Sequence, residues 1–133
     1  MIIFSTITNF RQRMDALKKV KRGVYAAVED EIRKEFCCIS IDRIRHNNDM
    51  ILLDDSRIVI KLRLPDKKHH LAKKDGYRLI YLTYKDIEEV VFMDIYPKNG
   101  PLQQLDLSDV EIKSLIKMYI DEKEAGSLEP FNM

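Results

Sequence analysis

The chain lacks tryptophan and contains only four glycines and four prolines among its 133 residues. With so few chain-breaking residues and 45% apolar residues, it has neither the composition of a disordered chain nor that of a low-complexity one. Its apolar runs stay well below the roughly 18 residues that a membrane-spanning helix needs, and its first residues do not resemble a signal peptide. We therefore expect a cytoplasmic protein with no membrane partner, built as one domain over residues 1–121 with a polar tail over 122–133.

Cysteine is scarce as well, because Cys37 and Cys38 are the only two and are adjacent. A disulfide between neighbours would be strained, and the pair lacks the C-x-x-C spacing of metal and redox sites. The sequence also contains no G-x-S-x-G, no glycine-rich phosphate loop and no H-E-x-x-H. These absences predict no metal and no cofactor, and two reduced cysteines that are at least partly buried at the end of a helix.

Net charge is nearly absent, because 23 lysines and arginines against 22 aspartates and glutamates leave +1. The distribution of charge is uneven, however. Residues 11–28 carry six basic groups and one acidic group, residues 57–78 carry eight and two, and residues 106–133 carry three and seven. The nearly neutral chain therefore contains two basic segments and an acidic end. Its net charge alone argues neither for nor against a polyanionic partner.

The first third of the chain has the pattern of a strand followed by helix. Residues 2–4 form a short apolar run, after which Thr8 or Asn9 can cap a helix. Apolar residues then recur every three or four positions, in Phe10, Met14, Leu17, Val20 and Val24 and again in Ala27, Val28, Ile32 and Phe36. Because Gly23 can end a helix in the left-handed conformation, we interpret this segment as a helical hairpin, although one continuous helix would cost only about 1 kcal/mol.

The middle of the chain has the pattern of antiparallel strands. Residues 50–53 are a candidate short strand, and residues 57–64 alternate strictly between two faces. The apolar face has Ile58, Ile60, Leu62 and Leu64, and the opposite face has Arg57, Val59, Lys61 and Arg63. Residues 66–76 form a basic loop closed by the turn-type pair Asp75-Gly76, and residues 77–84 and 89–96 are two further strands.

A last helix is expected before the polar end of the chain. Asp106 or Ser108 can cap it, and Glu111 completes a capping box with Ser108. Its apolar face consists of Val110, Leu115, Ile116 and Tyr119, and we expect the chain to fray after Asp121. The predicted fold class is therefore α+β, with an N-terminal strand, a helical hairpin, an antiparallel β-meander and a C-terminal helix.

Basic side chains recur at the same face of the three predicted strands. Lys61 and Arg63 lie on the first strand, Arg78 begins the second, and Asp94, Tyr96 and Lys98 alternate along the third. Antiparallel neighbours are about 5 Å apart, so one surface can hold all of these groups. Fixed positive charge of this kind suits a phosphodiester whose oxygens gain negative charge during reaction. Solvated side chains without a ligand would give the same pattern.

Four stretches of this region resemble a known family. They are Ile60-Lys-Leu-Arg-Leu-Pro65, Gly76-Tyr-Arg-Leu-Ile-Tyr81, Val90-Val-Phe-Met-Asp-Ile-Tyr-Pro-Lys98 and Leu105-Asp-Leu-Ser-Asp-Val-Glu-Ile112. Their types and order resemble the RelE/HigB toxins of type II toxin–antitoxin systems, which belong to the RelE/ParE superfamily. The resemblance covers residues 2 to about 120.

The resemblance implies a small α+β ribonuclease that enters the ribosomal A site, cleaves the bound mRNA without a metal and is held inactive by a cognate antitoxin. In such enzymes the ribose 2′-hydroxyl attacks the adjacent phosphate while basic side chains stabilise the transition state. By position, the resemblance assigns the phosphate contacts to Lys61, Arg63, Arg78 and Lys98. Candidates for proton transfer are His69, His70, Asp94 and Tyr96.

Further basic residues are expected to bind the RNA substrate, namely Arg57, Lys67, Lys68, His69, His70, Lys73 and Lys74. Two features depart from the family: Asp75 stands where relatives often have a second glycine, and the net charge is low for such a toxin. Two alternatives therefore stay open. One is a ParE-like toxin, which shares the fold but inhibits DNA gyrase, and the other is a non-enzymatic module that binds RNA or an acidic protein.

Overall fold

The computed structural model describes residues 1–37, 39–45, 50–52 and 54–133, and its centre is a six-stranded mixed sheet in the order β2-β3-β4-β5-β1-β6. The strands are β1 (Ile3–Thr6), β2 (Met50–Leu52), β3 (Arg57–Leu64), β4 (Tyr77–Tyr84), β5 (Glu89–Pro97) and β6 (Glu129–Pro130). Strands β2 to β5 form an antiparallel meander, and β1 pairs with β5 in parallel. The predicted α+β class and the predicted meander are confirmed.

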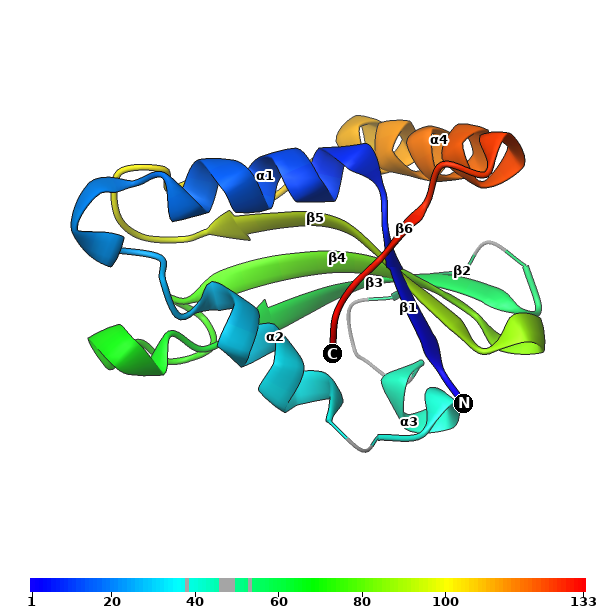
Figure 1. Cartoon of the computed structure of the whole chain (residues 1–133), viewed down its shortest axis with the longest axis horizontal. Coiled ribbons are helices and arrows are strands. Elements are labelled where there is room, and N and C mark those ends of the chain that lie inside the picture. Colours follow the sequence, from blue (N-terminus) through cyan, green and yellow to red (C-terminus); the bar gives the residue numbers. More distant parts are fainter. Residues whose placement is uncertain (38, 46–49, 53) are drawn as a thin grey trace.

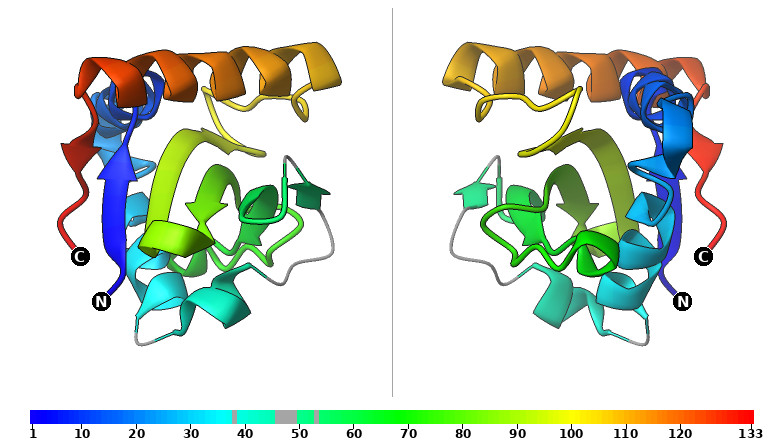
Figure 2. Two further views of the ribbon diagram at one scale, coloured as in Figure 1. Left: turned by 90° about the vertical axis from the view of Figure 1, so that its right-hand side faces the viewer. Right: turned by 90° about the vertical axis from the view of Figure 1, so that its left-hand side faces the viewer.

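Helices cover both faces of this sheet. They are α1 (Thr8–Lys18), α2 (Val28–Phe36), α3 (Ile41–Ile44) and α4 (Asp109–Ala125), with short 3₁₀ turns η1 (Lys21–Gly23), η2 (Lys67–His69) and η3 (Lys85–Ile87). Phe10 of α1 and Phe36 of α2 both contact Phe92 of β5. Lys123 of α4 pairs with Glu89, which alternation places on the other face of β5. Helix α4 therefore lies across the sheet opposite α2 (Figures 1 and 2).

The alternation predicted for β3 is correct for its apolar face. Ile58, Ile60, Leu62 and Leu64 are all buried. Val59, on the opposite face, is also fully buried, and it separates Arg57 at one end of that face from Lys61 and Arg63 at the other. The expected strand over residues 50–53 is present as β2, and Leu53 lies outside the described residues.

The helical hairpin differs from the prediction in its first helix and in its packing. Helix α1 ends at Lys18, because Val20 is extended and both Arg22 and Gly23 have positive φ angles of 68° and 61°. The two helices pack on different strands, α1 on β5 and α2 on β3. Each helix therefore buries its own apolar stripe against the sheet.

Neither Thr8 nor Asn9 caps α1, which is a second correction. The N-cap position is Ile7, and no side chain of its own segment caps the helix. Instead, the backbone N–H and the hydroxyl of Thr8 both donate to Oε1 of Glu122 in α4, each at 2.9 Å. A carboxylate at a helix N-terminus also interacts favourably with the helix dipole. Because Glu122 is distant in the sequence, only the tertiary fold brings it there.

The segment after α2 also departs from expectation. Cys37 is exposed instead of partly buried; it follows Phe36, the last residue of α2, and its backbone is extended. Cys38 lies outside the described residues. The alternating segment from Ile39 leads into the one-turn helix α3, whose N-terminus is capped by the Ser40 side chain.

The C-terminal segment is ordered, which corrects the prediction of a frayed tail after Asp121. The capping box of Ser108 and Glu111 is present as predicted, but α4 continues to Ala125, and Gly126 ends it with a φ of 68°. The chain then returns to pair with β1 as β6, which places Phe131 5.0 Å from the ring of Phe92. Aromatic burial against the core explains why this polar segment folds back.

The apolar face of α4 also needs one correction. Leu115 and Tyr119 are buried as predicted and Ile116 is half-buried, whereas Val110 is 76% exposed. Ile112, two residues later, takes the buried position at the start of the helix.

Truncating Phe131 should measure the contribution of this returning segment. Phe131→Ala removes ring contacts with Phe92 and with Phe10, so we expect it to lower the free energy of unfolding by roughly 2 kcal/mol. Met133→Ala, two residues further on and 43% exposed, is the matched control and should change it by less than about 0.5 kcal/mol. Urea unfolding of both variants makes the comparison, and equal values would contradict the role assigned to Phe131.

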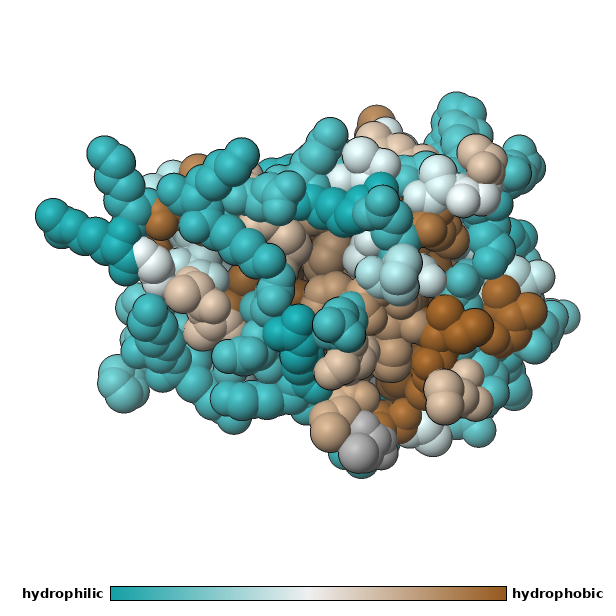
Figure 3. Space-filling model, in the orientation of Figure 1, coloured by the Kyte–Doolittle hydropathy of each residue, from teal (hydrophilic) through white to brown (hydrophobic). Residues whose placement is uncertain are grey.

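The face that carries α1 and α2 is divided by polarity. Hydrophilic side chains dominate one end, over α1, and apolar surface gathers at the other end, near β1 and η3 (Figure 3). Ile3 and Ile87 are exposed there, and the Ile3 N–H donates to the carbonyl of Glu88. Among the described residues, no helix combines the length and the apolarity that crossing a membrane requires.

Candidate functional site

The strand register brings three of the predicted site residues side by side. Arg63 of β3 pairs with Arg78 of β4, and Arg78 pairs with Tyr96 of β5. Lys61 and Lys98 lie two residues away along β3 and just past β5, on the same face by alternation. The meander therefore assembles Lys61, Arg63, Arg78, Tyr96 and Lys98 on one surface, which we call the cationic face.

Arg63 and Lys61 are the available cations of this face. The Arg63 side chain is exposed and the Lys61 side chain is half-buried. In the described part of the chain, no hydrogen bond or ion pair within 4 Å engages either side chain. Both can therefore contact an incoming anion without first releasing a protein partner.

Arg78 is engaged with the basic loop that precedes it. Its side chain is only 9% exposed, and its Nη1 and Nη2 donate to the carbonyls of Lys73 and Lys74 at 3.0 and 2.8 Å. Buried donors satisfied by backbone carbonyls fix the position of a loop. The sequence placed Arg78 at this site correctly in space, and the structure adds that Arg78 holds the loop of residues 73–75.

Asp106, which the sequence suggested only as a helix cap, lies at the centre of the cationic face. Its Oδ1 is 3.3 Å from Nζ of Lys98, 3.4 Å from the hydroxyl of Tyr96 and 3.7 Å from Nε of Arg78. Burial alone would raise the pKa of Asp106, but Lys98, Arg78 and Lys61 outweigh it and lower that pKa. No local sequence signal indicates this role, because Asp106 reaches the strands through the loop after β5.

Tyr96 is buried beneath this carboxylate. Its hydroxyl donates to Asp106 and accepts from the backbone N–H of Leu107, both at 3.4 Å. Burial raises the pKa of Tyr96 to about 12, although the hydrogen bond from Leu107 acts in the other direction. Tyr96 therefore remains neutral at physiological pH.

Asp94 does not join the cluster around Asp106. Its Oδ1 lies 3.1 Å from Nε of Arg13 in α1 and accepts the backbone N–H of Ile95 at 2.9 Å. A small cavity of about 150 Å³ between α1 and α4 is lined by Asp94, Arg13 and Glu111 among others. Asp94, a candidate for proton transfer on the cationic face, is thus paired with Arg13 of α1.

Replacing Asp94 should change how stability depends on pH. Burial raises the pKa of Asp94 above its ordinary 3.8, and Arg13 opposes this shift only in part. The folded protein then binds the proton more tightly than the unfolded chain, so the wild type loses stability as pH rises from about 4 through the folded pKa. Asp94→Asn lacks this titration.

Urea unfolding at a series of pH values tests this expectation. The stability of Asp94→Asn relative to the wild type should improve as pH rises through that window and then level off. A relative stability that stays constant from about pH 4 to 8, or that improves toward acid, would contradict the raised pKa.

His69 and His70, the two candidate histidines, are not part of the cationic face. The Nδ1 atom of His69 lies 2.8 Å from Oδ2 of buried Asp66, which also accepts the hydroxyl of Tyr77 at 3.2 Å. Tyr77 precedes Arg78 and therefore points to the opposite face of β4. His70 is exposed and ends η2 in the left-handed conformation. The geometry thus separates His69 from the residues that it was expected to assist.

The predicted substrate-binding residues fall into two groups. Lys68 donates to the carbonyl of Gly23 at 3.1 Å, and Arg57 forms an ion pair with Asp54 at 2.8 Å at the far end of β3. The side chains of the other three lysines, which are Lys67, Lys73 and Lys74, are exposed and have no ion pair in the described residues. Among the predicted substrate-binding lysines and Arg57, the second group therefore has charge that is uncompensated within the described residues.

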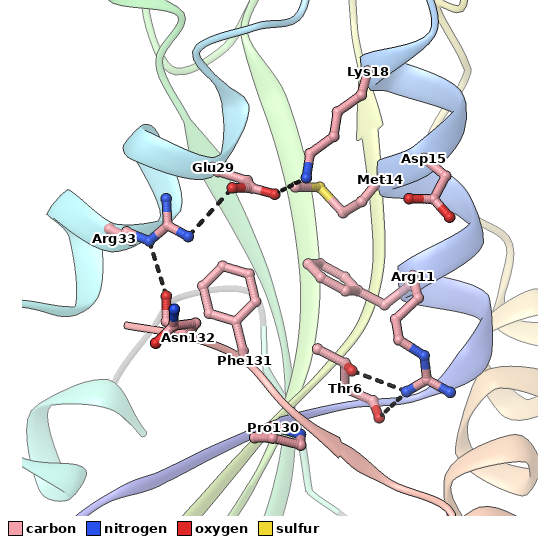
Figure 4. A pocket seen from close by; sticks show the side chains of 11 residues that line it. Thr6, Arg11, Met14, Asp15, Lys18, Glu29, Arg33, Pro130, Phe131 and Asn132 are labelled. Atoms are coloured by element: carbon pink, nitrogen blue, oxygen red, sulfur yellow. Dashed lines mark hydrogen bonds and ion pairs between the residues drawn. The ribbon is translucent and has the colours of Figure 1, made fainter.

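A cavity lies away from these residues, on the face that carries α1 and α2. It has a volume of about 270 Å³ and lies between α1, α2 and the C-terminal segment, with Phe10, Met14 and Phe131 among its lining residues (Figure 4). Its basic side chains are already paired, since Lys18 and Arg33 both contact Glu29. This cavity therefore offers no free cation to an anionic ligand.

Metal binding has no support in the described residues, where no three His, Cys, Asp or Glu side chains are grouped to hold an ion. Comparison with known proteins adds no family: no family model matches the sequence, and no curated protein matches it.

Proposed function

We propose that this protein is a toxin of the RelE/HigB kind, an endoribonuclease that cleaves ribosome-bound mRNA and is neutralised by an antitoxin protein. The observation that supports this most directly is the register that aligns Arg63, Arg78 and Tyr96 across three strands, with Lys61 and Lys98 beside them. The motifs that resemble the family are the segments that meet at this surface. Its chemistry suits a phosphodiester.

The reaction requires stabilisation of charge at phosphorus. The ribose 2′-hydroxyl gives its proton to water as its oxygen attacks the adjacent phosphorus, and the bond from phosphorus to the 5′-oxygen breaks. The 5′-oxygen takes up a proton from water, so a 2′,3′-cyclic phosphate and a 5′-hydroxyl result. Arg63 can donate two parallel hydrogen bonds to the phosphate oxygens, and Lys61 supplies a compact charge on the same strand face. Both interactions strengthen as negative charge builds up.

The remaining residues of the site act as supports in this proposal. Arg78 fixes the backbone of the basic loop through the carbonyls of Lys73 and Lys74, and the exposed side chains of these two lysines are available to the nucleic acid. Contacts of this kind with phosphates position a strand without reading its sequence. Tyr96, neutral and buried, holds Asp106 above the strands.

Inducing the protein in growing bacteria tests the proposal. We expect growth arrest and loss of mRNA with normal DNA supercoiling, and rescue when a neutralising partner is co-produced. Altered supercoiling with intact mRNA would favour the ParE-like alternative. Growth at the control rate with undisturbed translation would contradict toxin activity and leave a binding module.

A further inference from the structure

The Asp106 carboxylate occupies the position among the cations where a phosphate would be expected. In the described part of the chain, Asp106 is the only ion-pair partner of both Lys98 and Arg78. Its own side chain is 56% exposed, so it can swing into solvent without uncovering the core. An anion that is exposed yet held by cations competes with any other anion for them.

We propose that Asp106 is an internal competing anion that makes the cationic face selective for a phosphodiester chain over single small anions. A phosphate ion must displace Asp106 to reach Lys98 and gains little beyond the contact that it replaces. A nucleic-acid strand also reaches Lys61, Arg63 and the exposed lysines of the basic loop, so it gains contacts that Asp106 does not occupy. The identity of the strand as RNA rests on the proposed function.

The loop that carries Asp106 is fixed at several points before this residue. The hydroxyl of Tyr25 donates to the carbonyl of Asn99 at 2.8 Å and accepts the N–H of Leu102 at 3.0 Å. Nearer Asp106, Nζ of Lys98 donates to the carbonyl of Gln104 at 3.2 Å. Because the loop is anchored in this way, the carboxylate stays at a high effective concentration beside the cations. A free ion that makes only one such contact is therefore at a disadvantage when it competes for them.

The charge state of Asp106 supports the same role. The cations around it lower its pKa, so the carboxylate is ionised at neutral pH and remains a competing anion. A low proton affinity also makes it a weak general base, which favours the role of competitor over a direct part in proton transfer.

The test uses Asp106→Asn, with Asp109→Asn as a control that removes the same charge three residues away in the first turn of α4. Inorganic phosphate is titrated at constant ionic strength while NMR follows the backbone amides of β3 and Lys98. We expect Asp106→Asn to bind phosphate about tenfold more tightly than the wild type, and Asp109→Asn to differ less than about twofold. Adding Lys98→Ala to Asp106→Asn should abolish the gain.

A second probe separates this inference from the proposed function. A 2′-O-methyl RNA oligonucleotide cannot be cleaved by 2′-oxygen attack, and its binding to Asp106→Asn should show a log–log salt slope steeper by about 0.7 than in the wild type. Equal phosphate affinity in the wild type, Asp106→Asn and Asp109→Asn would overturn the inference, provided that melting shows all three folded. Tighter phosphate binding by Asp106→Asn with no RNA binding by any of them would support the competing anion and contradict the RNA substrate.

Discussion

Arg63→Ala is expected to reduce the rate of RNA cleavage by about 10²–10³ without a measurable loss of stability. The Arg63 side chain is exposed, and no hydrogen bond or ion pair engages it within the described residues, so removing it breaks no internal contact. The same side chain would donate to phosphate oxygens as they gain charge, which makes its contribution larger in the transition state than in the bound substrate. Cleavage rate and melting temperature are measured on the same sample.

Two further variants locate the effect. Arg63→Lys should recover only part of the activity, because an ammonium cannot make the paired contact of a guanidinium. Arg57→Ala removes an arginine from the same strand that is already paired with Asp54, and it should leave cleavage within about threefold of the wild type. Equal losses of cleavage rate for Arg57→Ala and Arg63→Ala would show that both arginines act only through non-specific attraction of the RNA.

Gly76→Ala is expected to have the largest effect on stability. A Cβ at this position would lie 2.1 Å from the carbonyl oxygen of Leu64 and within 3 Å of backbone atoms of Pro65 and Asp66. Backbone atoms of a paired strand cannot move aside cheaply, so we expect a loss of about 3 kcal/mol or more and a fall in melting temperature of about 10 °C. The strand start that carries Arg78 would shift as well, so RNA binding should weaken.

Gly126→Ala provides the matched control for this prediction. Gly126 has a φ of 68°, but nothing lies within 4 Å of a Cβ built there. The substitution therefore meets only the cost of a left-handed backbone, about 1 kcal/mol. If Gly76→Ala loses no more stability than Gly126→Ala, the backbone around Gly76 can make room for a Cβ without strain, which would contradict the prediction.

Much of the fold followed from local patterns that the tertiary structure does not override. Residues 57–64 form a strand because alternation and β-branched side chains agree, and the Ser108–Glu111 capping box starts α4 as spacing requires. The fold of the C-terminal segment could not be predicted from local patterns. It depends on the contact between Phe131 and Phe92, which are far apart in the sequence. Gly76 likewise serves the close approach of two strands, which its position in a turn-type pair does not indicate.

The cations of the candidate site could be predicted from the sequence, but the contacts that Asp106 makes with them could not. Period-two spacing along one predicted strand placed Lys61 and Arg63 on one face, and the predicted meander allowed Arg78 to share that surface; the structure adds the register that pairs Arg63 with Arg78. Asp106 could not be predicted, because its approach to Lys98 is set by the path of the loop after β5. Contacts between positions in different loops carry no periodic signal.

The most direct test of the central claim is to add the purified protein to ribosomes programmed with a defined mRNA and to map the ends of the RNA produced. The proposed activity predicts cuts within the codon in the A site, products ending in a 2′,3′-cyclic phosphate, much slower cutting with Arg63→Ala, and no cuts without ribosomes. Intact mRNA on ribosomes that translate normally in the presence of folded wild-type protein would contradict the claim.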